Sequence, residues 1–304
     1  MREANMLVCA VVLASCGNDD VLVLGDRDPP RYRFDDPERI EELAAPSKTD
    51  NPSLTADLLE LYFTSERNGG PAEIFVAKRA QHDAPFEAPV LAGALNARGI
   101  ETSPAVSADG LSIWFASDRA GGLGDLDIWV ATRSARDDDW SAPNNAAALS
   151  SEGRDIPRPP GQRGQVMPMA SDRDSPGSYQ VFFATRAADP AMFHAPQWVS
   201  ELAAPPSSTV DGFLTDDGLT LFYVTGPAIG PADLFVASRR TLDERFLEHA
   251  ALTELNTEQD ERDPWLSPDG TELYFASDRS GTYAIYVAAV RREPAIPDAG
   301  TRSN

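Results

Sequence analysis

The chain repeats itself about every 52 residues, and this period constrains its fold more than any other feature. Three short segments recur in a fixed order. The first begins at Pro52, Pro104, Gly212 and Pro264, the second at Leu61, Ile113, Leu221 and Leu273, and the third at Glu73, Asp127, Asp233 and Ala284. The copies of such a chain must pack against one another in a stack or in a ring, since one copy cannot bury its own apolar residues.

The interval between Pro104 and Gly212 is about twice the period, which predicts a fifth, degenerate copy within it. We assign residues 167–172 to its first segment and residues 181–186 to its second, and we find no clear third segment. An aromatic residue marks each copy, at Phe34, Phe86, Trp140, Trp198 and Phe246. In four of them a leucine follows nine positions later, at Leu43, Leu95, Leu149 and Leu255, whereas Trp198 has none.

The repeated segments have the composition of strands. They are short, rich in β-branched and aromatic residues, and separated by turn dipeptides such as Asp109-Gly110, Asp217-Gly218 and Asp269-Gly270. Glycine in such dipeptides adopts the positive φ that tight hairpin turns require. Three strands and a fourth, aromatic-led strand therefore predict one four-stranded antiparallel sheet per copy.

Four-stranded sheets repeated around an axis form a β-propeller, which protects its strand edges by closing into a ring. We therefore predict an all-β chain with a single propeller over residues 32–291. The Phe34 segment has no copy before it and the last copy lacks an aromatic-led strand, so N- and C-terminal strands should share the final blade. Five blades are predicted, or six if residues 150–190 contain another.

The N-terminus predicts export and a lipid anchor. Residues 6–15 form an apolar run that follows Arg2 and is too short to span a bilayer. The run ends in Leu13-Ala14-Ser15-Cys16, which resembles a bacterial lipobox. We expect a signal peptide over residues 1–15, an acylated Cys16 with a flexible tether over 16–31, and a disordered tail over 292–304. The alternative is an ordinary signal peptide that contains a chance cysteine.

Cysteine and charge content exclude several functions. Cys9 lies within the predicted signal peptide, so the mature chain has no thiol pair for a disulfide or a cysteine-based zinc site. The 48 acidic and 26 basic residues give a net charge of -22, which disfavours nucleic acid and anionic membrane surfaces. We expect a monomer that contacts the membrane through its lipid alone.

The last copy carries a family resemblance. Residues 267–270 read Ser-Pro-Asp-Gly, residues 273–279 read Leu-Tyr-Phe-Ala-Ser-Asp-Arg, and residues 285–287 read Ile-Tyr-Val. This pattern resembles the WD-like propeller repeat of TolB-type periplasmic proteins. The resemblance implies the propeller fold. The chain departs from TolB in its longer repeat and in lacking an evident N-terminal α/β domain, so a TolB-like role in envelope assembly is not implied.

Repeated charged residues are the candidates for a site. The pairs Asp118-Arg119 and Asp278-Arg279 could form a ring of charge around a ligand. Because they recur at one repeat position, we expect a structural role in which side chains bond to the backbone of the hairpins. The same role is expected for the turn residues Asp109, Gly110, Asp269 and Gly270. The three histidines, His82, His194 and His249, lack metal-ligand spacing, so no metal or cofactor is predicted, with calcium on acidic loops as an alternative.

These features predict a binding or scaffold propeller with no defined catalytic site. Its partner would be a protein or a glycan of the cell envelope, and its anchor would place it on the outer membrane, facing the periplasm or the exterior. The competing hypothesis is a propeller glycoside hydrolase with paired carboxylates in its axial funnel. The chain has no Gly-x-Ser-x-Gly elbow, so a peptidase is not expected.

Overall fold

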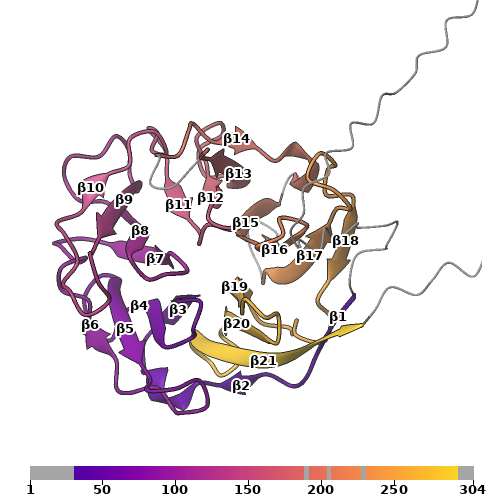
Figure 1. Ribbon diagram of the computed structural model, residues 1–304, viewed down its shortest axis with the longest axis horizontal. Helices are drawn as coiled ribbons and strands as arrows, with labels where there is room; N and C mark the ends of the chain where they lie inside the picture. Colours follow the sequence, from indigo (N-terminus) through magenta and orange to yellow (C-terminus); the bar gives the residue numbers. More distant parts are fainter. Residues whose placement is uncertain (1–30, 188–191, 204–206, 227–230, 294–304) are drawn as a thin grey trace, which may run out of the picture.

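The strands form five antiparallel sheets arranged as a ring of blades around a central axis (Figure 1). The computed structural model describes residues 31–187, 192–203, 207–226 and 231–293. Within them the chain is an all-β propeller of four-stranded blades, which confirms the predicted fold class and gives five blades. The predicted signal peptide, most of the tether, and the tail beyond residue 293 lie outside the described residues.

The first three blades follow one another along the chain, each running from the axis outward. The first contains β3 (Thr49–Leu54), β4 (Glu60–Ser65), β5 (Glu73–Lys78) and β6 (Val90–Leu91). The second contains β7 (Glu101–Val106), β8 (Ser112–Ser117), β9 (Asp127–Thr132) and β10 (Asn144–Asn145). The third contains β11 (Asp155–Pro157), β12 (Val166–Ser171), β13 (Gln180–Thr185) and β14 (Gln197–Trp198).

The fourth blade keeps this order, and the fifth takes strands from both ends of the chain. The fourth contains β15 (Ser208–Leu214), β16 (Thr220–Gly226), β17 (Asp233–Ser238) and β18 (Glu248–Ala251). The fifth contains β19 (Glu261–Leu266), β20 (Glu272–Ser277) and β21 (Ala284–Glu293), with β1 (Arg31–Phe34) and β2 (Glu38–Arg39) on its outer side. Two short 3-10 helices, η1 (Glu41–Leu43) and η2 (Ser200–Leu202), lie on connections between blades.

The N-terminal strands close the ring, as predicted. Both β1 and β2 pair with β21, placing Phe34 opposite Val290 and Glu38 opposite Val287. Phe34 is buried in a cluster that also contains Phe222 of the fourth blade and Phe275 of the fifth. The first and last strands of the chain therefore share one sheet, and the outer edge of β21 is covered.

The third blade corrects the predicted alignment. Residues 167–172 belong to β12, the second strand of the blade, and residues 181–186 begin in β13, the third. The degenerate strand is the first, β11, where Pro159 and Pro160 follow and the Ser/Thr-x-Asp turn of the other blades is missing. The described part of residues 150–190 is thus occupied by this blade and contains no sixth one.

The structure also corrects the predicted aromatic marker of the third blade, which is Phe193 and not Trp198. Trp198 is 50% exposed on the outer strand β14, whereas Phe193 is 5% exposed and precedes the buried Leu202 by nine positions. Phe193 stacks on Arg186, just as the aromatic markers of three other blades stack on an arginine seven residues earlier. The pairs and their distances from guanidinium carbon to ring centre are Arg79 and Phe86 at 4.4 Å, Arg133 and Trp140 at 4.4 Å, Arg186 and Phe193 at 4.6 Å, and Arg239 and Phe246 at 4.6 Å.

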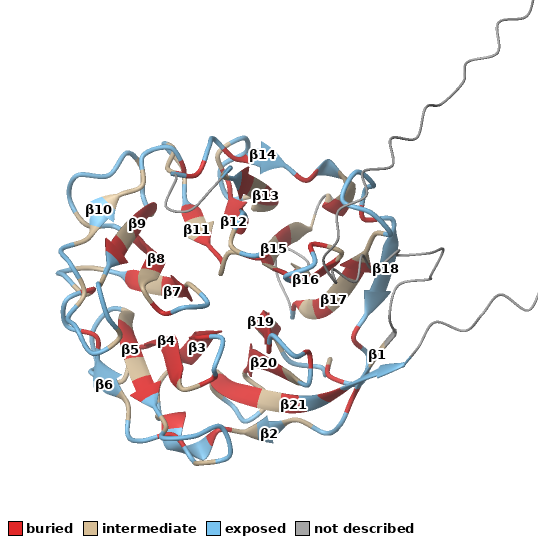
Figure 2. Ribbon diagram, viewed as in Figure 1, coloured by how far each residue is buried: buried red, intermediate tan, exposed pale blue. Residues whose placement is uncertain are grey.

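Apolar side chains between neighbouring blades form the core. Leu61 and Phe63 of the first blade, for example, lie in one buried cluster with Tyr274 and Ile285 of the fifth. Figure 2 shows buried residues concentrated in the inner three strands of each blade, while the outer strands β6, β14 and β18 are exposed. Each blade is thus stabilised by contact with both neighbours, so an open ring would expose two such faces.

Truncation tests the closure. A chain that begins at residue 41 lacks β1 and β2, so it loses the buried Phe34 and Ile40 and leaves β21 unpaired on its outer side. We expect its melting temperature to fall by roughly 10 °C or more, given the cost of deleting buried aromatic residues. A chain that begins at residue 29 is the control and should melt like the full chain. Equal melting temperatures for the two truncations would contradict closure by the N-terminal strands.

Candidate functional site: the axial channel

Polar side chains at one repeat position meet at the axis of the propeller. Asn51, Ser103, Asp211 and Asp263 occupy equivalent positions of four inner strands, and all four have positive φ, between 52° and 58°. Each lies at a register shift between the first and second strands of its blade. Such bulges redirect side chains and are common near functional sites. Ser103 donates a hydrogen bond to Asn51 (2.9 Å), and the Asn51 backbone donates one to Asp263 (3.1 Å), so the residues contact one another across blades.

Arg158 completes this polar layer from the third blade. It is 6% exposed, and its Nη2 contacts a carboxylate oxygen of Asp211 and one of Asp263, the latter at 2.6 Å. Its Nε has no partner in the described structure. The other inner strands carry proline or glycine at this position, so the arginine is specific to the third blade. A single guanidinium therefore bridges the two axial carboxylates and neutralises much of their charge.

Further charges surround the start of the inner strands. Asp50 is buried beside Lys48, whose Nζ lies 2.6 Å from its carboxylate. Burial, together with repulsion from Asp263, raises the pKa of Asp50 despite the attraction of Lys48. Burial likewise raises the pKa of Asp211, opposed by attraction to Arg158. These carboxylates are desolvated and paired with cations, as in a structural ion network.

An apolar funnel of about 440 Å³ opens at the opposite ends of the inner strands. Phe213 and Trp265, each two residues beyond an axial aspartate, form one wall, with their ring centres 5.9 Å apart. The third blade, which is next to the fourth in the ring, contributes Pro159 and Pro160 to the lining. The remaining apolar lining comes from Leu54, Val106, Leu214 and Leu266. Volumes of this order accommodate small molecules or single side chains.

The rim of the funnel is charged. Arg163, Asp216, Asp217 and Arg292 contribute to it, together with Ser267. Asp217 accepts hydrogen bonds from the Thr215 hydroxyl (2.6 Å) and the Leu219 backbone (2.9 Å), so it stabilises its own turn. Among the described residues, neither Arg163 nor Arg292 has a carboxylate partner.

The repeated residues singled out from the sequence make intramolecular contacts. Asp109 accepts hydrogen bonds from Ser107 (2.6 Å) and from the Leu111 backbone (2.9 Å), and Asp269 makes equivalent bonds to Ser267 and Thr271. The glycines that follow, Gly110 and Gly270, both have a φ of 73°. Residues other than glycine adopt this backbone conformation only at a cost in free energy.

The Asp-Arg pairs lie at the end where the inner strands begin. Asp118 accepts a hydrogen bond from the Ile100 backbone (2.8 Å), and Asp278 accepts one from the Asp260 backbone (2.9 Å). Arg119 bonds to the Leu95 carbonyl and to Glu101, and Arg279 bonds in the same way to Leu255 and Glu261. These contacts attach each connecting loop to the blade that follows it, and they leave the pairs away from the funnel lining.

The histidines remain apart from one another. His82 lies 3.1 Å from Glu272, and His249 lies 3.1 Å from the Tyr223 hydroxyl. Across residues 31–293, as far as the structure describes them, no three His, Cys, Asp or Glu side chains are placed to hold a metal ion. No helix in those residues has the length and apolarity needed to cross a membrane. Cys16, the predicted lipid attachment site, lies outside the described residues.

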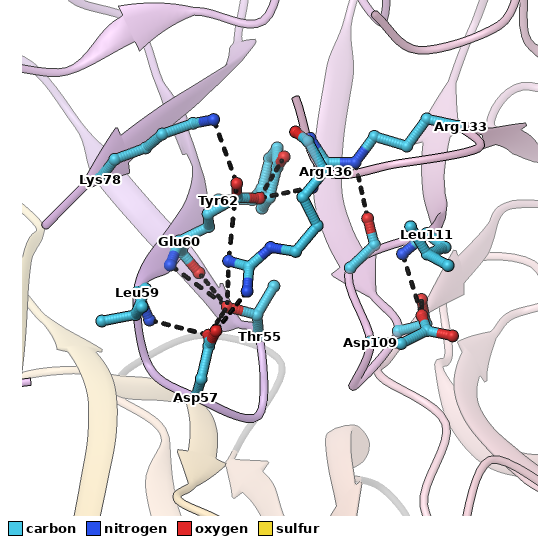
Figure 3. Close-up of polar contacts among 12 residues, drawn as sticks. Thr55, Asp57, Leu59, Glu60, Tyr62, Lys78, Asp109, Leu111, Arg133 and Arg136 are labelled. Atoms are coloured by element: carbon cyan, nitrogen blue, oxygen red, sulfur yellow. Dashed lines mark hydrogen bonds and ion pairs between the residues drawn. The ribbon is translucent and has the colours of Figure 1, made fainter. Parts of the chain in front are cut away.

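A buried ion network fastens the first blade to the second beside the funnel (Figure 3). Glu60 contacts Arg133 at 2.5 Å, Lys78 at 3.1 Å and the Tyr62 hydroxyl at 3.1 Å. Burial alone would raise the pKa of Glu60, but hydrogen bonds from Arg133 and Lys78 lower this pKa below its ordinary value. Of these contacts, the one with Arg133 joins the first blade to the second, while Lys78 and Tyr62 belong to the same blade as Glu60.

Sequence reasoning missed the residues that make the axis distinctive. Arg158, Phe213 and Trp265 break the repeat at positions where other blades have proline, glycine or small residues. A correct alignment of the third copy would have exposed Arg158 as an exception. The arginine seven residues before each aromatic marker was the signal that could have supplied this alignment.

Comparisons with known proteins identify the architecture. No family model matches the chain, and no curated protein matches it. Among solved structures it is similar to a thermostable family-43 glycoside hydrolase, with a TM-score of 0.56 and 11% identity over 88% of this chain and 100% of that one. It is also similar to an endo-arabinase from Bacteroides thetaiotaomicron, with a TM-score of 0.55 and 14% identity over 86% and 98% of the two chains.

TolB from Acinetobacter baumannii is a further match, with a TM-score of 0.49 and 17% identity over 82% of this chain. The chain spans 57% of the length of that protein. The similarities to the family-43 glycoside hydrolase and the endo-arabinase support a propeller fold, and at such identities they do not extend to activity.

The Glu60 network generates a stability prediction. Glu60→Gln removes the charge that Arg133 and Lys78 face, so the free energy of unfolding at pH 7 should fall by about 3 kcal/mol. Because the pKa of Glu60 is lowered in the folded state, its contribution is present above the ordinary glutamate pKa of 4.5 and is lost as the pH falls below that value and through the lowered pKa of the folded state. The difference between the two proteins, measured by urea unfolding, should therefore shrink in acid.

The exposed Glu42 provides the matched control, since the described structure gives its side chain no ion pair. Glu42→Gln should change the free energy of unfolding by less than about 0.5 kcal/mol at either pH. Equal effects of the two substitutions would mean that the network does not fasten the blades.

Proposed function

We propose that this propeller is a non-catalytic binding module that holds a protein or glycan partner at the cell envelope. The observation that carries the proposal is the bridging of Asp211 and Asp263 by Arg158 at the axis. A glycoside hydrolase with paired carboxylates needs one of them free to donate a proton and the other free to attack or to activate water. In this chain one oxygen of each carboxylate contacts the same guanidinium nitrogen.

Repeat equivalence supports the same interpretation. Asp211 and Asp263 occupy the position that Asn51 and Ser103 hold in other blades, and all four have the same backbone conformation. They therefore form one polar layer rather than two unique carboxylates placed opposite each other. The funnel beneath this layer is apolar and leads to a charged rim, an arrangement suited to holding a ligand through packing and a few polar contacts.

Glycan turnover is the direct test. We expect no hydrolysis of arabinan or of aryl glycosides above the buffer blank, because Arg158 occupies the space between the two carboxylates. Asp211→Asn and Asp263→Asn serve as matched variants. Turnover by the unaltered chain that either variant abolishes would establish the glycoside hydrolase in place of the binding module. Turnover that both variants retain would point to carboxylates elsewhere and would equally overturn the proposal.

The proposed location rests on residues 13–16. We propose that residues 1–15 are removed, that Cys16 is acylated, that residues 16–31 tether the propeller, and that the anchor sits in the outer membrane. Labelling of cells with an alkyne fatty acid should mark the chain, and Cys16→Ser should abolish the label and release the protein into the soluble fraction. Cys9→Ser is the control and should leave the label in place. Labelling that survives Cys16→Ser would exclude this anchor.

A further inference from the structure

The funnel combines an apolar interior with a charged rim, on which Arg163 and Arg292 have no carboxylate partner among the described residues. Phe213 and Trp265 form its aromatic wall, and the third blade, next to the fourth in the ring, contributes Pro159 and Pro160. Equivalent positions of the first two blades carry the small residues Ser53 and Ala105. The repeat is therefore broken in favour of large rings on one side, which gives the funnel a defined apolar face.

The loop that carries Arg163 has an unusual conformation. Gln162 and Arg163 have φ values of 49° and 55°, and Gly164 follows at 78°. Non-glycine residues in this region are strained and persist where the surroundings fix them. Two backbone bonds between Gly161 and Val166 close the loop, and Gln162 donates a third bond to the Thr215 carbonyl of the fourth blade (3.1 Å). The strained loop therefore holds Arg163 at the rim.

Arg292 reaches the same rim from the fifth blade. Its guanidinium carbon lies 5.6 Å from the centre of the Tyr32 ring, and its terminal atoms lie against the turn at Gly270. Both arginines are exposed and, among the described residues, lack a carboxylate partner. Two such cations at one opening are notable in a chain with a net charge of -22.

We propose that the funnel binds a monoanionic amphiphile, that is, a molecule with an apolar chain or ring and a single carboxylate. The apolar part would pack against Phe213 and Trp265, and the carboxylate would accept hydrogen bonds from Arg163 and Arg292. Guanidinium groups suit carboxylates because their paired N–H donors match the two oxygens. Asp216 and Asp217, both exposed on the same rim, disfavour polyanions, so the proposed ligand carries a single charge. The inference deepens the proposed binding role, and it rests on that role.

Displacement of a fluorescent probe tests the proposal. N-phenylnaphthylamine, which is apolar and uncharged, should bind the full chain and brighten. Decanoate, decanol and decylamine, each kept below its micelle concentration, share one chain length and differ in charge. Decanoate should displace the probe at roughly one-tenth of the decanol concentration, in line with the strength of charge-assisted bonds to arginine. Decylamine should displace it no better than decanol.

Substitutions test whether the rim arginines cause the preference for decanoate over decanol. In the double variant Arg163→Gln with Arg292→Gln, the concentration of decanoate that displaces the probe should rise to that of decanol. The concentration of decanol that displaces the probe should not change. Arg98→Gln with Arg245→Gln removes the same charge from exposed positions outside the funnel lining and should preserve the preference. Ala108→Trp, at an exposed turn residue that lines the funnel, should abolish probe binding, and Ala56→Trp provides a second block if the first variant melts early.

Three results would overturn the proposal. They are absence of probe binding to the unaltered chain, a decanoate preference that survives loss of both rim arginines, and probe binding that survives both tryptophan blocks. Glycan turnover is measured separately, so failure of the proposed function and failure of this site are distinguishable. A chain that bound decanoate and also hydrolysed glycans would retain the site and lose the non-catalytic role.

Discussion

Pairing of the first and last strands of the chain is the constraint on which the rest of the structure depends. β1 and β2 cover the outer side of β21, which completes the fifth blade, and this blade packs against both the fourth and the first. The apolar clusters lie between blades, so their burial requires a complete ring. The axial channel exists for the same reason, because its polar layer and its funnel are assembled from residues that meet only when all five inner strands surround one axis.

Along that axis, polar and apolar layers have separate functions. Asp211 and Asp263 contact Arg158, and two residues further along the same strands Phe213 and Trp265 line the funnel. Burying two carboxylates would be costly if they were unpaired, and the guanidinium offsets that cost. The same contact removes the free acid and base that hydrolysis of a glycosidic bond requires. One arginine therefore pairs with both carboxylates of the layer, and this pairing is the basis of the proposed non-catalytic role.

Besides the axial bridge made by Arg158, arginines occur in three distinct settings in this propeller. In four blades an arginine stacks on an aromatic marker and bonds to a turn carbonyl, as Arg133 does to Gly110. In another series Arg119 and Arg279 attach loops to the following blade. Arg163 and Arg292, by contrast, face the funnel rim without a carboxylate partner among the described residues. Because most guanidinium groups are engaged internally, the rim pair is a strong candidate for contact with a ligand.

The sequence by itself determined the propeller and its closure and favoured five blades over six, because strand periodicity and turn dipeptides are local signals that recur at a fixed spacing. The sequence analysis misplaced the third copy for two reasons. The turn motif of the other blades is missing after Pro159 and Pro160, and the exposed Trp198 was assigned as the aromatic marker in place of the buried Phe193. Only the tertiary structure decided that Arg158 lies between Asp211 and Asp263, which are 53 and 105 positions away along the chain. Whether a carboxylate is free or neutralised depends on which charges share its surroundings, and in a ring those charges come from different repeats.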